Sequence, residues 1–453
     1  QRQMCIRDRN IVIRKEFFTM IWNKEMECAD RETMQALQLE RLKKTVKHEY
    51  DNVAPYRKKM EEAGVTPEDI KTLDDIVKLP FTSKEDLAAN YPTGLFAKPM
   101  REIVRIQASS GTTGKPKIAG YTRNDLEMWG ECVARGLTMA GADRDSVVHV
   151  SYGYGLFTGG LGAHLGAETI GATVIPMSSG NTQKQIMFLN DMKSTVLCCT
   201  PSYALTIAEG VAKAGIKPED LALKAGVFGA EPWTQAMRDK IEAGLGIKAH
   251  DIYGLSEVMG PGVSTSCSEN NGMHIQEDYF YPEIINPDTL EPVPDGEKGE
   301  LVITTIGKEG MPLIRYRTRD ICYLMREKCA CGRTTVRMSR VFGRTDDMLI
   351  IRGVNVFPSQ VETVIAKFSK ELTMNYKLYV GREHNTDTFE LGVEMAEGLA
   401  IDDIKFAEAL RGRVEHALRD MLGIGCKVRL LNEGTLPRSE GKAVRVEDTR
   451  KLD

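Results

Sequence analysis

The sequence predicts an α/β protein built from two domains of unequal size. Its 453 residues exceed what one hydrophobic core usually serves, so we expect the chain to divide. Between residues 147 and 253 short apolar runs alternate with segments of helical periodicity, which is typical of βαβ units and a mainly parallel sheet. Beyond residue 280, shorter strands with proline and glycine turns predict a β-rich subdomain. We therefore expect a large N-terminal α/β domain with this subdomain, followed by a small C-terminal α+β domain.

The region before the sheet is predicted to be helical and to carry no catalytic cluster. Asp30 is a plausible cap for a helix over residues 30–50, and residues 66–69 and 82–86 are two more helix starts with acidic first turns. Thr122 caps a further helix, whose apolar residues fall three or four apart on one face. In the sheet region we predict strands at residues 147–150, 173–175, 196–199, 225–228 and 249–253, and helices at residues 159–170, 182–192, 202–214 and 234–245.

A change of pattern at Gly343 marks the predicted domain boundary. We place the boundary at residues 344–346, which gives a large domain over residues 20–343 and a small domain over residues 344–453. The first nineteen residues fit poorly with the rest of the chain, and Met20 would be a natural start. We therefore expect residues 1–19 to be a non-native or disordered extension. The small domain is predicted to hold strands at residues 348–351, 377–380, 390–394 and 427–431 and helices at residues 359–368 and 402–422.

Composition and charge exclude several classes of protein. Hydrophobic residues make up 42% of the chain, charged residues 27%, and the formal net charge is −4, an ordinary profile that indicates no nucleic-acid partner. No run of about 18 apolar residues occurs and the N-terminal stretch lacks the apolar core of a secretory signal, so we expect no membrane span and a cytoplasmic location. The ten cysteines are irregularly spaced, unlike a secreted disulfide framework, and most are expected to be reduced.

A phosphate loop is predicted at residues 108–117, ASSGTTGKPK, after a short apolar run. Its glycines allow close backbone approach, its hydroxyls and N–H groups can surround an anion, and its lysines add counter-charge. The Walker A template fails, because position 109 is serine and the first lysine is followed by Pro116, which has no hydroxyl for a metal ion. A mobile linker is the alternative. The candidate residues are Ser109, Ser110, Gly111, Thr112, Thr113, Gly114, Lys115 and Lys117.

Further segments carry residues suited to a nucleotide. In the sequence YGLSE, Tyr253 could stack on a base while Glu257 holds a Mg²⁺ ion that also binds phosphate oxygens. In the sequence YRTRD, Asp320 can accept both ribose hydroxyls. The alternatives are a strand followed by a turn and a salt-bridged turn. A tight turn at the same end of the sheet, whose backbone could line an adenine, consists of Gly229, Ala230, Glu231 and Pro232.

An aromatic pocket is predicted where residues 151–157, SYGYGLF, follow a strand. Three aromatic side chains and two glycines suit the binding site of an aromatic acid, and the alternative is that they belong to the core. The aromatic residues are Tyr152, Tyr154 and Phe157.

A metal site is predicted from three thiols and one imidazole, a number and softness that suit tetrahedral zinc. The spacing is not that of a standard zinc finger, and buried thiols beside a loop histidine are the alternative. Four protein ligands leave no open position for water, so a zinc ion here would be structural and would join the segment after Glu257 to the loop before the domain boundary. The ligands would be Cys267, His274, Cys329 and Cys331.

Taken together, the motifs resemble a known superfamily. ASSGTTGKPK, YGLSE and YRTRD are followed by GRTDD at residues 343–347 and LPRSEGK at residues 436–442, an order that resembles the adenylate-forming superfamily of acyl-CoA synthetases. Residues 90–92, 94–96, 251–262 and 350–358 look more specifically like phenylacetate-coenzyme A ligases. The resemblance runs from about Trp22 to the C-terminus.

The resemblance implies a two-step reaction that uses ATP, Mg²⁺ and coenzyme A. The carboxylate of an aryl-acetic acid, phenylacetate first of all, attacks the α-phosphorus of ATP to give an acyl-adenylate and pyrophosphate. The thiol of coenzyme A then displaces AMP. The phosphate charge must be neutralised while in-line geometry is held. The residues that match the catalytic positions are Lys442, Glu257, Thr112 and Lys117.

The resemblance also implies that the small domain is mobile. Lys442 must reach the α-phosphate in the first step and the thiol tunnel must open for the second, with Asp346 as the pivot and Arg344 as a nucleotide contact. A homodimer is expected on the same basis. Another aromatic acid (benzoate, hydroxyphenylacetate or indoleacetate) and a carrier-protein thiol loaded in trans stay open. The remaining matched residues are Asp251, Gly254 and Ser256 for the nucleotide, and Ala230, Gly254 and Pro261 for the acid.

Overall fold

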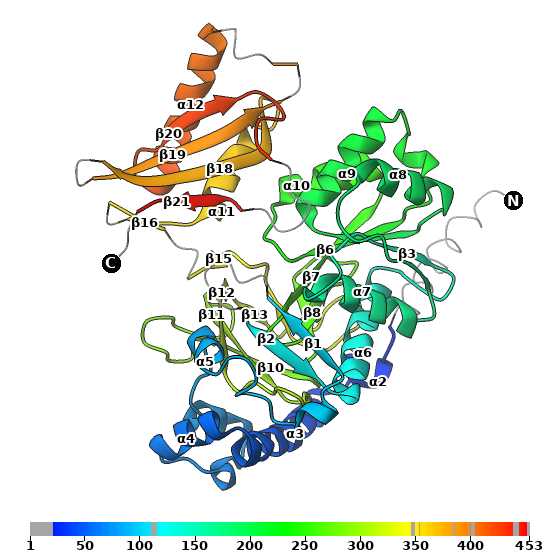
Figure 1. The fold of residues 1–453 in the computed structure, drawn as a ribbon, viewed down its shortest axis with the longest axis vertical. Helices are drawn as coiled ribbons and strands as arrows, with labels where there is room; N and C mark the ends of the chain where they lie inside the picture. The colour runs from blue at the N-terminus through cyan, green and yellow to red at the C-terminus, as the bar shows by residue number, and fades with distance from the viewer. Residues whose placement is uncertain are drawn as a thin grey trace, which may run out of the picture.

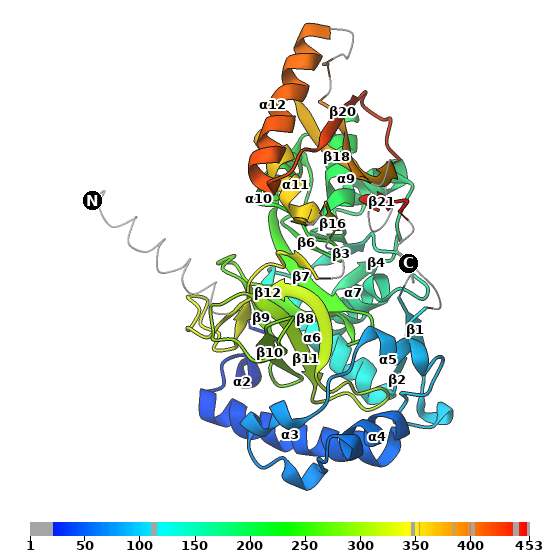
Figure 2. The same ribbon diagram turned by 90° about the vertical axis from the view of Figure 1, so that its left-hand side faces the viewer.

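The computed structural model describes residues 21–109, 116–345, 349–352, 354–383, 386–396, 398–399, 404–437 and 444–450. Within these residues the chain forms a large part and a small part, and the predicted α/β class is confirmed. Figures 1 and 2 both show the small part at the opposite end of the molecule from the N-terminal helices α3 (Arg31–Asn52) and α4 (Ala54–Glu62). No helix in the described ranges is long and apolar enough to cross a bilayer.

Helices form the start of the chain, as predicted. The Asp30 carboxylate accepts a hydrogen bond from the backbone N–H of Thr33 and so caps α3. The two later starts with acidic first turns are the 3-10 helix η1 (Pro67–Asp69) and the helix α5 (Lys84–Ala89). The other helical elements of this region are α2 (Lys24–Glu27), η2 (Leu73–Lys78) and η3 (Met100–Glu102).

A hairpin carries the predicted phosphate loop. Strands β1 (Arg105–Ala108) and β2 (Ile118–Tyr121) pair antiparallel, with Ala108 opposite Ile118. The sequence indicated only a short apolar run before the loop, and it did not predict β2, which is four residues long. Helix α6 (Arg123–Met139) follows at once and starts with a capping box between Thr122 and Asp125. Its predicted apolar face is buried, and it consists of Leu126, Trp129, Val133 and Leu137.

A nine-stranded mixed sheet forms the centre of the large part, in the order β13-β14-β9-β8-β7-β6-β5-β3-β4. Its parallel half lies close to the predicted strands and consists of β3 (Val147–Val150), β4 (Thr173–Ile175), β5 (Val196–Cys199), β6 (Ala225–Gly229) and β7 (Lys248–Leu255). The antiparallel half consists of β8 (Gly260–Ser266), β9 (Met273–Ile275), β13 (Leu324–Met325) and β14 (Arg337–Met338). The connecting helices are α7 (Thr158–Thr169), α8 (Thr182–Asp191), α9 (Pro201–Lys213), η4 (Pro218–Asp220) and α10 (Gln235–Leu245).

The parallel pairing of the strands brings the candidate residues to one edge of the central sheet. The carboxyl ends of β3, β6 and β7 lie at one edge of the sheet, because these strands run in the same direction. The segments at these ends are residues 151–157, 229–232 and 253–257, which the sequence assigned to the acid and the nucleotide. The sheet therefore gathers the predicted acid and nucleotide segments at the edge where ligands bind in open α/β folds.

The predicted β-rich subdomain is a separate antiparallel sheet. It contains β10 (Phe280–Ile285), β11 (Gly299–Thr305), β12 (Tyr316–Cys322) and β15 (Gly343–Arg344), in that order. Asp320 of β12 lies opposite Arg344 of β15. The short pairing of β12 with β15 thus holds the end of the large part against the YRTRD segment.

The small part has its own sheet and its own core. Strands β20 (Lys427–Leu431), β19 (Thr386–Met395), β18 (Leu372–Glu383) and β21 (Val446–Asp448) lie side by side, next to α11 (Pro358–Lys367), α12 (Ile404–Leu422) and a hairpin of β16 (Leu349–Ile351) and β17 (Val354–Val356). The sequence did not predict β17 or β21. The hydrophobic cluster of this part also includes Met237 of α10, with Leu205 and Trp233 packed against it. Residues of α9 and α10 therefore contact the small part, and the Ser359 hydroxyl of α11 also donates a 2.6 Å hydrogen bond to the Phe342 carbonyl of the large part.

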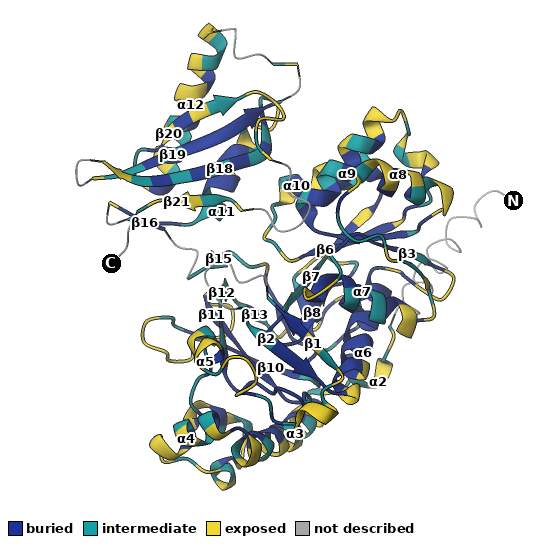
Figure 3. Ribbon diagram, in the orientation of Figure 1, coloured by how far each residue is buried: buried dark blue, intermediate teal, exposed yellow. Residues whose placement is uncertain are grey.

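The buried residues of both parts lie mainly along the strands of their sheets. Figure 3 shows buried residues along the strands of both parts and exposed residues on the outer faces of α4, α8 and α12. A charged residue nevertheless lies in the core: Arg135 of α6 is 1% exposed. Its guanidinium donates two hydrogen bonds to the Asp278 carboxylate, of 2.7 and 3.0 Å, and one to the Gln276 side chain. This pair joins α6 to the segment between β9 and β10.

Replacing Arg135 by methionine is expected to lower the free energy of unfolding by about 3 to 5 kcal/mol, because Asp278 would stay buried without its partner. The control is Arg326→Met, whose pair with Asp295 is half-exposed on both sides and contributes about 1 kcal/mol or less. Thermal unfolding of both variants measures the difference. Equal melting temperatures for the two variants would contradict this assignment.

Candidate active site

The two ends of the phosphate loop are joined by hydrogen bonds between Ser109 and Lys117. The N–H of Ser109 donates to the carbonyl of Lys117 at 3.1 Å, and the N–H of Lys117 donates to the Ser109 hydroxyl at 3.3 Å. The N–H of Ala108 donates to the carbonyl of Leu156, so the hairpin is joined to the segment after β3. The loop therefore starts and ends at the ligand edge of the sheet. Outside the described residues lie Ser110, Gly111, Thr112, Thr113, Gly114 and Lys115.

Asp320 connects three of the sequence motifs. Its carboxylate accepts a hydrogen bond of 2.6 Å from the Tyr253 hydroxyl and one of 2.9 Å from Arg344, which also donates to the Thr318 carbonyl. Asp320 is 4% exposed. Burial, together with this carboxylate, raises the pKa of Tyr253 well above its usual value. The structure thus brings together the tyrosine, aspartate and arginine that the sequence assigned separately to a nucleotide.

Glu257 lies in the turn that follows β7. It is buried, and its carboxylate makes no hydrogen bond or ion pair with any residue that the structure describes. The turn is fixed beside it, because the Ser256 and Thr158 hydroxyls are 3.1 Å apart and Gly254 approaches Gly260 so closely that a Cβ would lie 1.8 Å from the Gly260 carbonyl oxygen. A buried carboxylate without a protein partner fits the predicted role of a Mg²⁺ ligand.

The turn after β6 has the geometry of a backbone binding site. Ala230 has a φ angle of 72°, which a residue with a side chain rarely adopts. A Cβ on Gly229 would lie 2.1 Å from the carbonyl oxygen of Ile252, so only glycine fits there. Pro232 follows within the same turn. The backbone of these residues faces the ligand edge from a position next to β7.

Two residues of the predicted nucleotide segments, Glu231 and Asp251, use their carboxylates for contacts inside the protein. Glu231 accepts a 2.7 Å hydrogen bond from the backbone N–H of Ser202 in the first turn of α9. Asp251 accepts hydrogen bonds from the Trp233 indole and from the Arg238 guanidinium. In this arrangement both carboxylates fix α9 and α10 to the sheet.

The predicted acid-binding residues surround the glycines at the start of α7. A Cβ on Gly159 would lie 2.7 Å from the Phe157 ring, and one on Gly160 would lie 2.9 Å from the Tyr154 ring. Tyr152 is 5% exposed and packs in the core, whereas Phe157 is 36% exposed. The Tyr154 hydroxyl lies 3.2 Å from Nδ1 of His164. Pro261 packs against the same helix, where it would be 2.6 Å from a Cβ on Gly162.

The four predicted zinc ligands meet in one cluster. Their ligand atoms all lie within 4.8 Å of one another. The two sulfurs of Cys267 and Cys329 are 3.7 Å apart, and the Cys331 sulfur is 3.4 Å from Nε2 of His274. Tetrahedral zinc with Zn–S bonds of about 2.3 Å and a Zn–N bond of about 2.0 Å would set these separations at about 3.7 and 3.5 Å. Nδ1 of His274 lies 2.9 Å from the Thr335 hydroxyl, a contact that orients the ring.

Hydrogen bonds from Cys267 and His274 lower the pKa of the Cys331 thiol. A thiolate is the form that binds metal. The geometry of the cluster and the lowered pKa of Cys331 both fit a structural zinc ion, although the same hydrogen bond raises the pKa of Cys267. The cluster joins the end of β8 and β9 to the loop before β14.

Comparison with known proteins identifies the family. A family model described as "AMP-binding enzyme" matches residues 17–308, and one described as "AMP-binding enzyme C-terminal domain" matches residues 353–450. Phenylacetate-coenzyme A ligase of Thermus thermophilus is 50% identical over 95% of this chain and all of its own length, and that of Escherichia coli is 51% identical over 96% of this chain and 99% of its own. The chain belongs to the phenylacetate-coenzyme A ligase family. The predicted class, an AMP-forming acid-coenzyme A ligase, is confirmed.

Solved structures of a related ligase add information on the arrangement of the two parts. The structure of 2-hydroxyisobutyryl-CoA ligase in its postadenylation state, in complex with an acyl-AMP, is 28% identical and has a TM-score of 0.88 over 95% of this chain and 93% of the other. The same enzyme in the thioesterification state, with CoA also bound, has a TM-score of 0.71 over 95% and 92%. This member of the phenylacetate-coenzyme A ligase family is therefore more similar to the structure of that enzyme in its postadenylation state than to the one in its thioesterification state.

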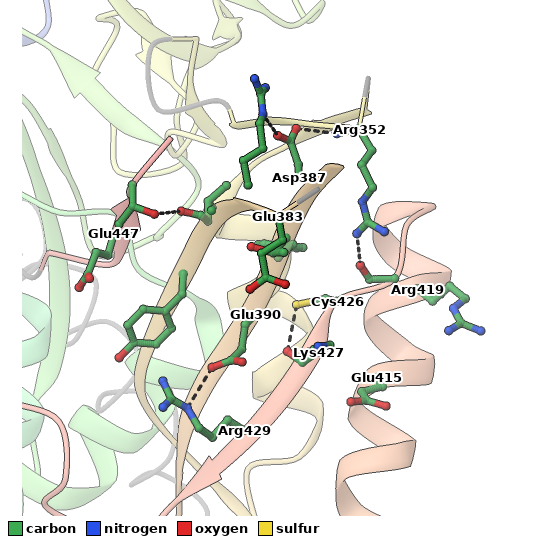
Figure 4. A pocket seen from close by; sticks show the side chains of 18 residues that line it. Arg352, Glu383, Asp387, Glu390, Glu415, Arg419, Cys426, Lys427, Arg429 and Glu447 are labelled. Atoms are coloured by element: carbon green, nitrogen blue, oxygen red, sulfur yellow. Dashed lines mark hydrogen bonds and ion pairs between the residues drawn. The ribbon is translucent and has the colours of Figure 1, made fainter. Parts of the chain in front are cut away.

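A cavity of about 700 Å³ in the small part does not belong to this site. It is lined by residues of β18, β19, β20 and α12, and none of the residues assigned to nucleotide or acid lines it. Figure 4 shows one of the ion pairs among its charged side chains, that of Arg429 with Glu390 at 3.0 Å. Arg382 and Asp387, at 3.2 Å, form a second pair. These two pairs neutralise part of the charge of the cavity, and its lining residues lie outside the predicted nucleotide and acid segments.

Sequence reasoning missed two residues beside Glu257. Lys308 is 2% exposed, and its ammonium donates a 2.8 Å hydrogen bond to the carbonyl of Val258. Burial lowers the pKa of this lysine to about 8. Tyr121, at the end of β2, is fully buried and donates to the carbonyl of Met259. A lysine between Gly307 and Glu309 has the pattern of a surface turn, so no local signal predicted its burial.

Asp320→Asn is expected to weaken ATP binding by about 10-fold or more, because an amide accepts fewer hydrogen bonds and leaves Arg344 without a charged partner. Asp295→Asn is the control, since Asp295 pairs with an exposed arginine away from the motifs. Isothermal titration with ATP compares the two variants. Unchanged ATP affinity in Asp320→Asn would remove Asp320 from the nucleotide site.

Proposed function

We propose that this protein joins phenylacetate to coenzyme A, with conversion of ATP to AMP and pyrophosphate. The observation that carries the proposal is identity of about 50% with phenylacetate-coenzyme A ligases over nearly the whole of both chains. The gathering of Tyr253, Asp320 and Arg344 in one hydrogen-bonded group supports a nucleotide at the predicted place.

The first step is the attack of the acid's carboxylate on the α-phosphorus of ATP. Asp320 is suited to accept the ribose hydroxyls, and the backbone of Gly229 and Ala230 to line the adenine. A Mg²⁺ ion held by Glu257 would neutralise phosphate charge. By the family resemblance Lys442 binds the α-phosphate, and Thr112 and Lys117 hold the remaining phosphates. Lys442 and Thr112 lie outside the described residues.

The acid is proposed to bind between the segment after β3 and the turn after β7. Tyr154, Phe157 and Pro261 offer apolar surface there, and their grouping around the glycines of α7 supports an aromatic ring as the part recognised. Among the described residues of this group, no charged side chain enters it. Such a surface suits phenylacetate, whose only charge is the carboxylate that reacts.

We propose that the large domain spans residues 20–343 and the small domain residues 344–453, with the pivot at Arg344 and Asp346. Separate hydrophobic cores support the division, since among the described residues the small part's cluster includes Met237 of the large part, with Leu205 and Trp233 packed against it. The two TM-scores against one related enzyme support a change of arrangement between the steps. Asp346 lies outside the described residues, as do residues 1–19.

We further propose that the cluster of Cys267, His274, Cys329 and Cys331 holds one structural zinc ion. The observed separations support it because they match those of a tetrahedral site. The zinc would have no part in the reaction, since all its positions are taken by protein. The cytoplasmic location and the homodimer stay predictions of the sequence.

The proposed reaction is tested with ATP, Mg²⁺, coenzyme A and phenylacetate, with products identified by mass spectrometry. Phenylacetyl-CoA, AMP and pyrophosphate are expected, and Lys442→Ala is expected to lower the rate by about 100-fold or more, because charge stabilisation in the transition state is lost. Lys427→Ala removes an exposed lysine of the small part and serves as the control. ADP in place of AMP would overturn the proposal, and replacement of phenylacetate by benzoate, hydroxyphenylacetate or indoleacetate tests the choice of acid.

Metal analysis of the purified protein is expected to find about one zinc ion per chain. Cys331→Ser should lose the zinc, because a hydroxyl is a much weaker ligand than a thiolate. Cys28→Ser should keep it, since Cys28 is a half-buried thiol outside the cluster. Zinc absent from the unmodified protein, or retained in full by Cys331→Ser, would show that the cluster is not a zinc site.

A further inference from the structure

The turn that carries Glu257 presents a row of backbone carbonyls to the interior. Its first hydrogen bonds run from the N–H groups of Val258 and Met259 to the carbonyl of Leu255. The carbonyls of Ser256 and Met259 accept hydrogen bonds of 3.3 and 2.7 Å from one hydroxyl, that of Tyr121. This side of the turn is therefore joined to β2, the strand that leaves the phosphate loop.

The other carbonyls of the turn face a buried ammonium group. Nζ of Lys308 donates to the carbonyls of Val258 at 2.8 Å and Glu257 at 3.4 Å. The same ammonium lies 4.7 Å from the centre of the Tyr121 ring, within the range of a cation–π contact. Tyr121 and Lys308 thus occupy all four carbonyls of residues 256–259, and the two side chains also contact each other.

The segment that carries Lys308 is itself anchored. The Asp125 carboxylate accepts hydrogen bonds from the backbone N–H groups of Glu309 at 2.7 Å and Gly310 at 2.9 Å. Asp125 belongs to the capping box of α6, directly after β2. The ammonium therefore stands at a fixed point between the start of α6 and the turn.

A buried ammonium group that contacts neutral carbonyls contributes little to the stability of the fold. Removing an ammonium from water costs several kcal/mol, and neutral carbonyls return less than a carboxylate would. No carboxylate of the described residues lies within ion-pair distance of Lys308, although Asp125 and Glu257 are near enough to favour its charged form. The Glu257 carboxylate, on the neighbouring turn, makes no hydrogen bond or ion pair with those residues. The lysine contacts the backbone of this turn and leaves the carboxylate available.

We propose that Lys308 is a positioning residue, which holds the turn of residues 256–259 so that the Glu257 carboxylate faces the metal ion of bound MgATP. This inference rests on the proposed function, in which Glu257 is the Mg²⁺ ligand. Lys308 fixes the backbone of Glu257 on one side, and Tyr121 ties the same turn to a strand that begins one residue after Lys117 of the phosphate loop. The pair thus holds the turn that carries Glu257 at a fixed position relative to β2.

The test is the Mg²⁺-dependent binding of a non-hydrolysable ATP analogue, α,β-methylene-ATP, measured by isothermal titration with excess Mg²⁺ and with EDTA. Lys308→Met keeps the length of the side chain and removes the ammonium. It is expected to weaken binding in Mg²⁺ by about 10-fold or more, as loss of a group that orients a metal ligand does, and to change binding in EDTA by less than about 2-fold. The matched control is Lys248→Met, which removes an exposed lysine that also donates to a backbone carbonyl.

Tyr121→Phe provides a second, milder variant that removes only the hydroxyl from the turn. It is expected to weaken binding in the same Mg²⁺-dependent way and by a smaller factor, and it decides the question where Lys308→Met does not fold. Circular dichroism and thermal unfolding establish the fold of each variant. A merely structural role would lower nucleotide binding equally with and without Mg²⁺.

Two results would overturn the inference: wild-type Mg²⁺-dependent affinity in folded Lys308→Met, or a loss of equal size in Mg²⁺ and in EDTA. For Tyr121→Phe used alone, affinity equal to wild type in Mg²⁺ has the same meaning. The proposed function is judged by another measurement, the formation of phenylacetyl-CoA by the unmodified protein. If no acyl-CoA forms with phenylacetate while the analogue still binds in a Mg²⁺-dependent way, the choice of acid fails and the binding data still decide the role of Lys308.

Discussion

The carboxylate of Asp320 is the constraint on which the candidate site depends. It accepts hydrogen bonds from Tyr253 at the end of the parallel half of the central sheet and from Arg344 at the end of the second sheet. Because Asp320 is buried, loss of its carboxylate would leave these donors without a partner and would lower the stability of the site. Three segments are thereby held in one place, and the segment that leads to the small part starts from that place. The position of the nucleotide residues and the exit of the chain toward the small part are fixed by the same group.

The arrangement of the two parts follows from how little the small part shares with the rest. Its hydrophobic cluster draws on β18, β19, α11 and α12 and takes in one residue of the large part, Met237. The ion pair between Lys213 and Glu433, at 3.6 Å with half-exposed partners, adds little to this contact. A contact of this kind holds one arrangement without preventing another. That agrees with the two TM-scores, 0.88 and 0.71, against two states of one related ligase.

Much of the architecture was predictable because its signals are local. The parallel strands and their helices were found at nearly their observed bounds, since continuous apolar runs and helical periodicity are properties of short windows. Thr122 and Asp30 were recognised as caps for the same reason. Strands β2, β17 and β21 were missed, because they are three or four residues long and form through pairing with a partner. Strand β8 was also missed, although it is seven residues long. The family was identified from motifs whose order along the chain is itself sequence information.

The sequence by itself determined the fold class, the family and the residue types that meet at the ligand edge. Only the tertiary structure decided which of them touch. It placed Asp320 between Tyr253 and Arg344, gave the Glu231 carboxylate to Ser202, and set the zinc candidates at tetrahedral separations. It also buried Lys308, which has the sequence context of a surface lysine. The physical reason is that pairing and burial depend on segments far apart in the chain, and no short window of sequence records which of them will pack together.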